Sequence, residues 1–466
     1  MRSHSVLLAL VLCSLPPAAQ SRKLNLPLPE RLPSGGGAFF RVTPDSRRVV
    51  YLTRQTGDAR DEVRSVLADG SAAAQLLSAG IPGEETLDHD FFLSPDGARV
   101  VFATLEPVAL DPITTGARVR LYSAGADGSQ RAKPLFEHVG SPGYVSFSPE
   151  GQWVLYLTTD YELERSALWS FPTDGHRDPI RLAELQGSLD EPLVTAGGRV
   201  IFQEVRAGVA ELVSLTLTGT DRVRLNEPLP TGRYVADFAV SEDGTRVVYR
   251  ANQNSRQVFE LFSVPVDGSA APVLLNGALV SGGTVGAFDL SPDARRVAYL
   301  ATQDSERITE LYSVPIDGSA APVKLNGILG SGQGVEPGAT FTPDSSRVVF
   351  RADALQRDKF QLFSVPADGS APPALISGPS AAGGDVSAAW DVSKPHLSVP
   401  GDRIVFLGDL QQGGVDELFS ALLDGSAPRT LLSGSMVTGG DVRSDFVLSA
   451  DGRTVVFRAD RLTDQA

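Results

Sequence analysis

Residues 260–277 read ELFSVPVDGSAAPVLLNG, and residues 310–327 read ELYSVPIDGSAAPVKLNG. Two stretches this similar within one chain are typical of a repeat architecture. In each copy an Asp-Gly pair separates two short runs of apolar and β-branched residues, which predicts a tight hairpin between two strands. Looser copies of the stretch begin at Glu62, Arg120, Ala167, Glu211, Gln361 and Glu417.

A second motif alternates with the first. It consists of SPDG or a variant, followed by a strand-like run such as RVVYR or RVVFR. Ser or Thr, Pro, Asp and Gly in this order suit a type I turn, because Pro fixes φ at the second position and Gly ends the turn. Clear copies begin at Thr43, Ser94, Ser148, Ser241, Ser291, Thr342 and Ser449, and degenerate copies begin at Thr195 and Pro400.

Two hairpins per repeat make a four-stranded unit, and the period of roughly 46 to 58 residues is typical of propeller blades. We therefore predict an all-β protein, a β-propeller of four-stranded blades. Both motifs together give eight complete units between Phe39 and about Leu432, which predicts eight blades, with an open solenoid as the alternative. A ninth first hairpin, DFVLSADGRTVVFRAD, follows. Either it shares a blade with N-terminal strands, or the natural product continues beyond Ala466.

The combination of SPDG, a following RVVF strand and ELYSVPIDGS resembles the propeller repeats of the TolB-like family. Similar repeats occur in the propellers of prolyl-oligopeptidase-like enzymes. The resemblance covers residues 39–466 and implies the propeller fold, which serves many functions. It differs from TolB in having only a short segment, SRKLNLPLPERLPSGGGA, ahead of the first strand. The peptidases carry a further domain with a Gly-x-Ser-x-Gly nucleophile motif, and this sequence contains no such pentapeptide.

The first residues have the order of a secretory signal peptide. Arg2 precedes the apolar run Val6–Leu15, which is too short to span a bilayer, and small residues follow it. We predict a signal peptide at 1–20, a linker at 21–38 and the propeller at 39–466. The protein is then periplasmic or secreted and has no transmembrane segment.

Cysteine content and charge limit the chemistry. The only cysteine, Cys13, lies in the predicted signal, and the residues before it are not the small ones that precede a lipid-attachment cysteine, so we do not expect a lipoprotein anchor. The formal net charge of −15 disfavours nucleic acid and anionic lipid as partners. We find no paired-histidine or EF-hand motif, and we predict no cofactor and no metal.

Long connections are expected on the edge of each unit opposite its two turns, and long loops on a rigid scaffold are common binding sites. Three acidic residues should start the innermost strands at that edge, at the mouth of the central channel: Asp90, Asp237 and Asp445. Asp289 and Asp391 lie two residues further along their strands, with their side chains on the same side. We predict that they hold a cation or a cationic segment of a partner. The alternative is that they bond to backbone amides of neighbouring blades or face water.

These observations favour a non-catalytic, monomeric, exported propeller that binds a protein or peptide, or a glycan, in the cell envelope. The alternative is an enzyme, either the propeller part of a peptidase or a hydrolase or lyase with its site at the channel mouth. An enzyme needs converging acid, base or nucleophilic groups, and the sequence offers carboxylates without a histidine shared by several units.

Overall fold

The structure is a computed structural model that describes residues 39–54, 61–109, 115–160, 165–186, 192–206, 208–380, 384–387, 397, 402–437, 439–449 and 452–460. The predicted signal peptide and linker, Cys13 and Asp391 lie outside the described residues. Two compact units divide the chain: Met1–Leu189 with Thr216–Thr220, and Asp190–Leu215 with Asp221–Ala466. Within the described ranges, no helix has the length and apolar composition needed to cross a membrane.

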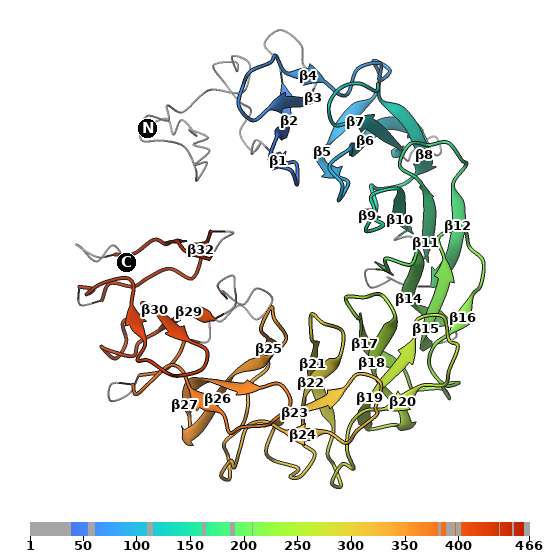
Figure 1. The fold of residues 1–466 in the computed structure, drawn as a ribbon. Helices are drawn as coiled ribbons and strands as arrows, with labels where there is room; N and C mark the ends of the chain where they lie inside the picture. Colours follow the sequence, from blue (N-terminus) through green and yellow to red (C-terminus); the bar gives the residue numbers. More distant parts are fainter. Residues whose placement is uncertain are drawn as a thin grey trace. The chain divides into compact units, whose positions relative to one another are not determined.

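Three four-stranded antiparallel sheets form the first unit, and in each the strands pair in chain order (Figure 1). The first sheet contains β1 (Phe40–Val42), β2 (Arg48–Arg54), β3 (Asp61–Leu67) and β4 (Gln75–Leu76). The second contains β5 (Thr86–Leu93), β6 (Arg99–Ala109), β7 (Thr115–Gly125) and β8 (Lys133–Val139). The third contains β9 (Tyr144–Phe147), β10 (Trp153–Asp160), β11 (Arg165–Pro172) and β12 (Ile180–Gln186).

The second unit continues the same order. The fourth sheet contains β13 (Leu193–Val194), β14 (Arg199–Arg206), β15 (Val209–Thr216) and β16 (Val223–Arg224). The fifth contains β17 (Val235–Val240), β18 (Arg246–Ser255), β19 (Val258–Pro265) and β20 (Val273–Leu274). The sixth contains β21 (Val285–Leu290), β22 (Arg296–Ala301), β23 (Glu310–Pro315) and β24 (Val323–Lys324). The seventh contains β25 (Thr340–Phe341), β26 (Arg347–Gln356), β27 (Lys359–Pro366) and β28 (Ala374–Leu375).

The last two sheets show fewer strands among the described residues. The eighth contains β29 (Arg403–Gly408), β30 (Glu417–Leu422) and β31 (Thr430–Leu431), and the ninth contains β32 (Val447–Leu448) and β33 (Val455–Val456). Isolated bridges from Val386 to Gly408 and from Leu397 to Ile404 lie where a first strand of the eighth sheet would pair. The predicted all-β class and four-stranded units are confirmed, and the number of blades stays a prediction.

The SPDG motif builds the turn between the first two strands of a sheet. The N–H of Gly97 donates to the carbonyl of Ser94 at 2.8 Å, which closes a type I turn. The Ser94 hydroxyl donates to Asp96 Oδ1 at 2.5 Å and accepts the N–H of Arg99 at 2.9 Å. One short polar side chain therefore fixes both sides of the hairpin, as it does in several other sheets.

The second residue after the fourth strand is related to the length of that strand. In the fifth sheet Asn276 Oδ1 accepts the N–H of Leu261 at 2.8 Å, and so takes a donor that a longer fourth strand would use. Asn226, Asn326, Ser78, Ser377 and Ser433 make the same bond in their own sheets, at 2.6–3.3 Å. The second and third sheets have no such residue, and their fourth strands, β8 and β12, run for 7 residues instead of 2.

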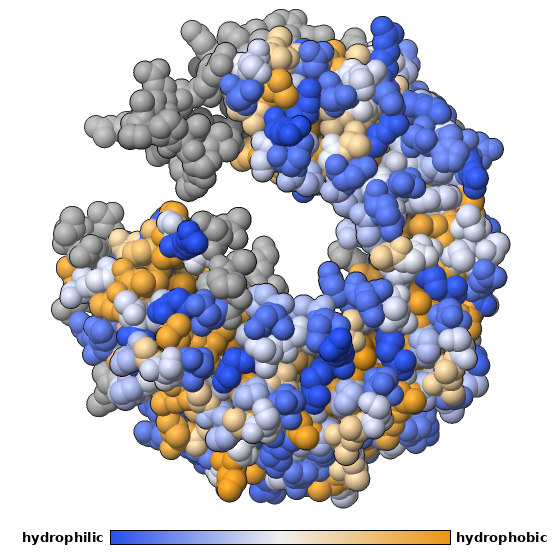
Figure 2. Space-filling model, viewed as in Figure 1, coloured by the Kyte–Doolittle hydropathy of each residue, from blue (hydrophilic) through white to orange (hydrophobic). Residues whose placement is uncertain are grey.

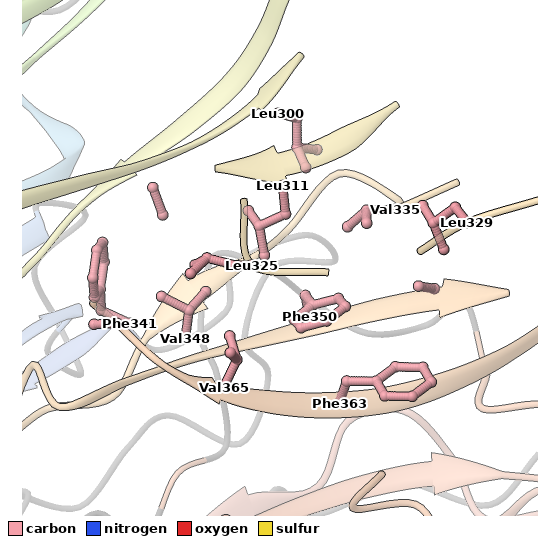
Figure 3. Packing of buried hydrophobic residues seen from close by; sticks show 13 residues of the cluster. Leu300, Leu311, Leu325, Leu329, Val335, Phe341, Val348, Phe350, Phe363 and Val365 are labelled. Carbon is pink, nitrogen blue, oxygen red and sulfur yellow. The ribbon is translucent and has the colours of Figure 1, made fainter. Parts of the chain in front are cut away.

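The core lies between neighbouring sheets. Leu311 and Leu325 of the sixth sheet are fully buried against Phe350 of the seventh (Figure 3). In each such pair, alternate residues of the second strand face opposite neighbours: Val348 packs toward the preceding sheet and Val349 toward the following one. Burying both faces of a sheet explains the continuous apolar runs of the RVVF type.

The ninth sheet differs in exposure. Val447 and Val456 are 63% and 69% exposed, and Figure 2 shows apolar surface over this last part of the second unit. The residues that correspond to Val456 in the fifth and seventh sheets, Val248 and Val349, are fully buried. Two apolar residues of the ninth sheet, Val447 and Val456, are therefore exposed where other sheets bury the corresponding residue.

Candidate functional site

The structure describes four of the five predicted acidic residues, and Asp391 lies outside its described residues. Asp90 lies inside β5 and not at its start, whereas Asp445 lies just before β32. Asp237 and Asp289 lie inside β17 and β21. The β5–β6, β17–β18 and β21–β22 ladders each shift register near these positions, because the first strand carries a β-bulge there.

Two of these carboxylates join neighbouring sheets. Asp90 pairs with Arg41 of the first sheet, with 3.3 Å between Nη2 and Oδ1. Asp289 Oδ2 accepts the N–H of Phe341, which belongs to the seventh sheet, at 3.0 Å. Burial raises the pKa of Asp289. The Asp289 contact is of the kind named in the alternative, a bond to a backbone amide of a neighbouring sheet, whereas Asp90 contacts a side chain of the neighbouring sheet.

The other two carboxylates pair with an arginine of their own sheet. Asp237 and Arg250 lie 2.8 Å apart, and Arg250 also donates to the carbonyl of Val285 in the next sheet at 3.4 Å. Asp445 pairs with Arg458, whose hydrogen bond lowers the pKa of that carboxyl. A ligand cation would have to replace these partners, and a ligand site at the strand ends stays a prediction. Among the described residues, no group of three or more metal-ligating side chains lies close enough to hold an ion.

A groove in the first unit brings together more polar and aromatic side chains than the strand ends do. It has a volume of about 700 Å³ and lies where the long fourth strand of the second sheet meets the third sheet. Its wall is formed by Tyr122 of β7, Pro134, Phe136 and Glu137 of β8, and Trp169 of β11, with Pro82, Glu85, Arg120, Leu135 and Pro179 completing it. A bulge at Leu135, opposite Leu121 and Tyr122, shifts the register of β8 here. We call this feature the rim groove.

One side of the rim groove is a closed polar network. The Glu85 side chain is 1% exposed, pairs with Arg120, and accepts the hydroxyl groups of Thr104 at 2.5 Å and Tyr122 at 3.0 Å. Arg120 Nε also donates to Glu137 at 2.6 Å. Burial and the hydrogen bond to Glu85 raise the pKa of Tyr122 to about 12. Each of these polar groups is thus held by another.

The other side of the rim groove is aromatic. The rings of Phe136 and Trp169 lie 4.9 Å apart between centroids, and Phe136 also lies 5.5 Å from Tyr156 and 5.7 Å from Phe171. The guanidinium of Arg181 lies 6.0 Å from the centre of the Trp169 ring. Rings packed in this way form a rigid surface, because each ring holds its neighbour in place.

A histidine contacts Tyr156, one of the rings on the aromatic side of the rim groove. His138 Nε2 lies 2.9 Å from the hydroxyl of Tyr156, which also accepts the N–H of Gly143 at 2.8 Å. Burial lowers the pKa of His138 and raises that of Tyr156 to about 12. A neutral His138 whose Nε2 accepts a hydrogen bond from the Tyr156 hydroxyl satisfies all of these contacts.

Comparisons with known proteins bear on the fold. No protein-family model and no curated protein sequence matches the chain. Among solved structures it is similar to dipeptidyl peptidase 4 from Porphyromonas gingivalis, with 12% identity, a TM-score of 0.50, and coverage of 85% of this chain and 59% of that one. It also matches TolB from Acinetobacter baumannii (14% identity, TM-score 0.31, 72% and 80% coverage). The β-propeller domain of the Trilobed protease from Pyrococcus furiosus matches at 13% identity (TM-score 0.32, 72% and 97% coverage).

The sheets are the blades of a β-propeller. Identities this low show the fold and not the function. The chain spans 59% of the length of the peptidase, and the activity of the whole enzyme is a property of that protein alone. On the blades, the rim groove lies at the outer edge between the second and third blades, away from the first strands that carry the predicted acids.

The rim groove was not predicted from the sequence. A signal for it was nevertheless present: Leu135 is followed by Phe136, where the first blade and the fourth to eighth blades have Asn or Ser after the corresponding residue. Trp169 stands where Phe262 and Tyr312 lie buried in their own blades, at 3% and 2% exposure. The blade motif alone could not show that the longer β8 leaves Trp169 partly exposed.

Proposed function

We propose that this chain is a non-catalytic, exported, monomeric propeller that acts as a binding scaffold in the cell envelope. Its partner is a protein, peptide or glycan, and the partner binds in the rim groove. Export rests on the signal-like residues 1–20. The observation that carries the binding role is the aromatic wall of the rim groove, where Phe136 and Trp169 are only partly buried. Concave sites with aromatic walls and a few polar groups are typical of ligand binding.

The polar side of the rim groove favours binding over catalysis. General acid or base chemistry needs a group that can give or take a proton at the substrate. Here Glu85 is occupied by Arg120, Thr104 and Tyr122. An enzyme, the alternative function, would need groups from elsewhere in the protein, such as the strand-end carboxylates, and the four of these that the structure describes already have partners.

The proposal is tested by crosslinking in intact cells that export the protein. A photoreactive phenylalanine replaces Pro82, an exposed residue of the rim groove, or Leu274, a residue 47% exposed on the outer strand of the fifth blade. We expect a discrete adduct from position 82 that disappears when Trp169→Ala is added, and none from position 274. The same adducts from both positions, or an adduct unaffected by Trp169→Ala, would show that the rim groove is not the binding site.

A further inference from the structure

We infer that Asn326 and Gly327 form a site of spontaneous deamidation in the folded protein. The matching pair in the preceding blade, Asn276 and Gly277, is protected. In this reaction the glycine backbone nitrogen loses its proton and forms a bond to Cγ of the asparagine, and the Cγ–Nδ2 bond breaks to release ammonia. Water then opens the cyclic succinimide to an isoaspartyl or aspartyl residue. The reaction involves no residue of the rim groove.

The two sites are alike in sequence. They are the two Asn-Gly pairs of the chain, and each follows a leucine at the end of the repeated stretch. Glycine has no side chain to hinder the attack of its nitrogen, so the ring closes most readily in an Asn-Gly pair. In the fourth blade the corresponding Asn226 is followed by Glu227, which has a side chain. A difference in rate between the two Asn-Gly pairs must therefore come from the structure.

The carbon that is attacked is prepared in the same way at both sites. Asn326 Oδ1 accepts the N–H of Leu311 at 2.7 Å, and its Nδ2 donates to the Gly327 carbonyl at 3.0 Å. Asn276 makes the same two bonds at 2.8 Å and 2.9 Å. These bonds hold the side-chain amide next to the glycine peptide. A backbone N–H on the amide oxygen also stabilises the negative charge that develops there during the attack.

The attacking nitrogen of the protected pair is blocked. The N–H of Gly277 donates to Gln303 Oε1 at 3.0 Å. The same side chain covers the glycine, because a Cβ added at Gly277 would lie 2.8 Å from Gln303 Nε2. Gln303 is buried and also accepts the hydroxyl of Tyr299 at 3.0 Å, which fixes its position. The Gly277 nitrogen must break this hydrogen bond before it can attack.

The nitrogen of Gly327 has no such block. Ala354, which has no acceptor in its side chain, stands in the seventh blade where Gln303 stands in the sixth. Among the residues that the structure describes, none accepts the Gly327 N–H. Gly327 is exposed, and a Cβ added there would contact only Pro373, at 3.9 Å. Water and hydroxide therefore reach this nitrogen, and the asparagine beside it is already in place.

Deamidation at this site changes the residue that ends the fourth strand of the sixth blade. In the isoaspartyl product the backbone runs through Cγ and is one carbon longer, so the oxygen that accepted the Leu311 N–H is displaced. Leu311 is fully buried, and a buried N–H without an acceptor destabilises the fold. The reaction also replaces a neutral amide with a carboxylate. We therefore expect the deamidated protein to be more acidic and to have a weakened sixth blade.

The test follows both sites in one sample of the folded full chain. The protein is incubated in mildly alkaline buffer below its unfolding temperature, and the peptides that contain residues 276 and 326 are quantified by mass spectrometry with fragmentation that distinguishes isoaspartate. We expect Asn326 to react about fivefold faster than Asn276 or more, because one hydrogen bond of ordinary strength protects the Gly277 nitrogen. In protein unfolded by urea, the two sites should react at similar rates.

Two variants test the cause. Gln303→Ala removes the acceptor and should speed the reaction at Asn276 about fivefold while leaving the rate at Asn326 unchanged. Asn326→Ser keeps an oxygen for the Leu311 N–H, as serine does in three other blades. This variant should not accumulate the acidic form that isoelectric focusing detects in the wild type.

Equal rates at the two sites in the folded protein, or reaction at Asn326 only in urea, would overturn the inference. Faster reaction at both sites in Gln303→Ala would also overturn it, because loosening of the sixth blade and not the lost acceptor would then control the rate. The crosslinking experiment does not depend on either asparagine, so the proposed function fails or stands separately.

Discussion

In the turn that joins the first two strands of a blade, one residue has a positive φ. The angle is +68° at Gly97 and at Gly244, and +59° at Ala294. This left-handed conformation costs an L-residue about 1–2 kcal/mol, whereas glycine adopts it freely. At residues 291–294 the motif reads SPDA in place of SPDG, so the turn is kept but Ala294 is strained and lowers the stability of the folded state.

We predict that Ala294→Gly raises the free energy of unfolding by about 0.5–1 kcal/mol, because relief of backbone strain exceeds the larger entropy that glycine has in the unfolded chain. The midpoint of urea denaturation measures it. The matched control, Gly244→Ala, should lower stability, since its new Cβ would lie 3.2 Å from Thr195 Cβ and the backbone stays left-handed. A less stable Ala294→Gly would contradict the prediction.

The buried carboxylate of Asp289 gives a second prediction at this scale. Burial raises its pKa, so folding disfavours its ionised form, and its stabilising contribution is lost as the pH rises above the unfolded value of about 3.9. Asn can keep the hydrogen bond from the Phe341 N–H. Asp289→Asn should therefore match wild type near pH 3 and be more stable than wild type at pH 7, in thermal unfolding measured across that range.

Asp237→Asn is the matched control for this experiment, because its carboxylate also lies in a first strand but pairs with Arg250. Removing that partly exposed ion pair should cost about 0–1 kcal/mol at pH 7. If both variants shift stability in the same direction at neutral pH, burial is not what governs Asp289.

At the scale of the strand, the second residue after the fourth strand acts as a stop. Asn276 is 6% exposed, accepts the Leu261 N–H and donates to the Gly277 carbonyl at 2.9 Å. Its side chain replaces the ladder bonds that a longer strand would supply. Where the stop is missing, in the second and third blades, the fourth strand is longer, and side chains of the longer strand of the second blade, β8, line the rim groove.

Asn276→Ala should lower the free energy of unfolding by about 1–3 kcal/mol, because the buried Leu261 N–H loses its acceptor. Asn276→Ser should cost less, since Ser78, Ser377 and Ser433 make the same bond at 3.1–3.3 Å in other blades. Urea denaturation compares the two variants. Equal losses would show that the size of the side chain matters and not its oxygen.

The sequence allowed us to predict the elements that depend on residues close together in the chain. The SPDG and DGS turns and the four-stranded unit follow from residues close together in the chain, and they were predicted. The bond of Asp289 to the Phe341 N–H joins residues of different blades and was expected only as an alternative, and the pairing of Asp90 with Arg41, which also joins two blades, was not predicted. The contact of Phe136 with Trp169 depends on a bulge and on the length of β8, which the repeat motif does not encode.

At the scale of the molecule, neighbouring blades are tied by polar as well as apolar contacts. Arg296, at the start of β22, donates to the fully buried hydroxyl of Ser313 at 2.8 Å. Hydrogen bonds from Ser370 and, as a smaller effect, the charge of Arg296 lower the pKa of Asp368 in the next blade. Asp289 of the sixth blade accepts the N–H of Phe341 in the seventh. Each blade thus depends on the blades beside it, as in other repeat proteins.

This dependence predicts which blades are destabilised by a substitution in the core. Leu311 is 0% exposed and lies between the sixth and seventh blades, so Leu311→Ala should cost about 2–5 kcal/mol. Because a blade contacts only its neighbours, backbone hydrogen exchange should become faster in β21–β24 and in β25–β28 while the strands of the first unit keep their protection. Leu274→Ala, which removes a side chain 47% exposed, is the control and should leave exchange unchanged. Faster exchange throughout the chain would mean that all blades unfold as one unit. Faster exchange in the sixth blade alone would mean that the packing shown in Figure 3 contributes little to the stability of the seventh blade.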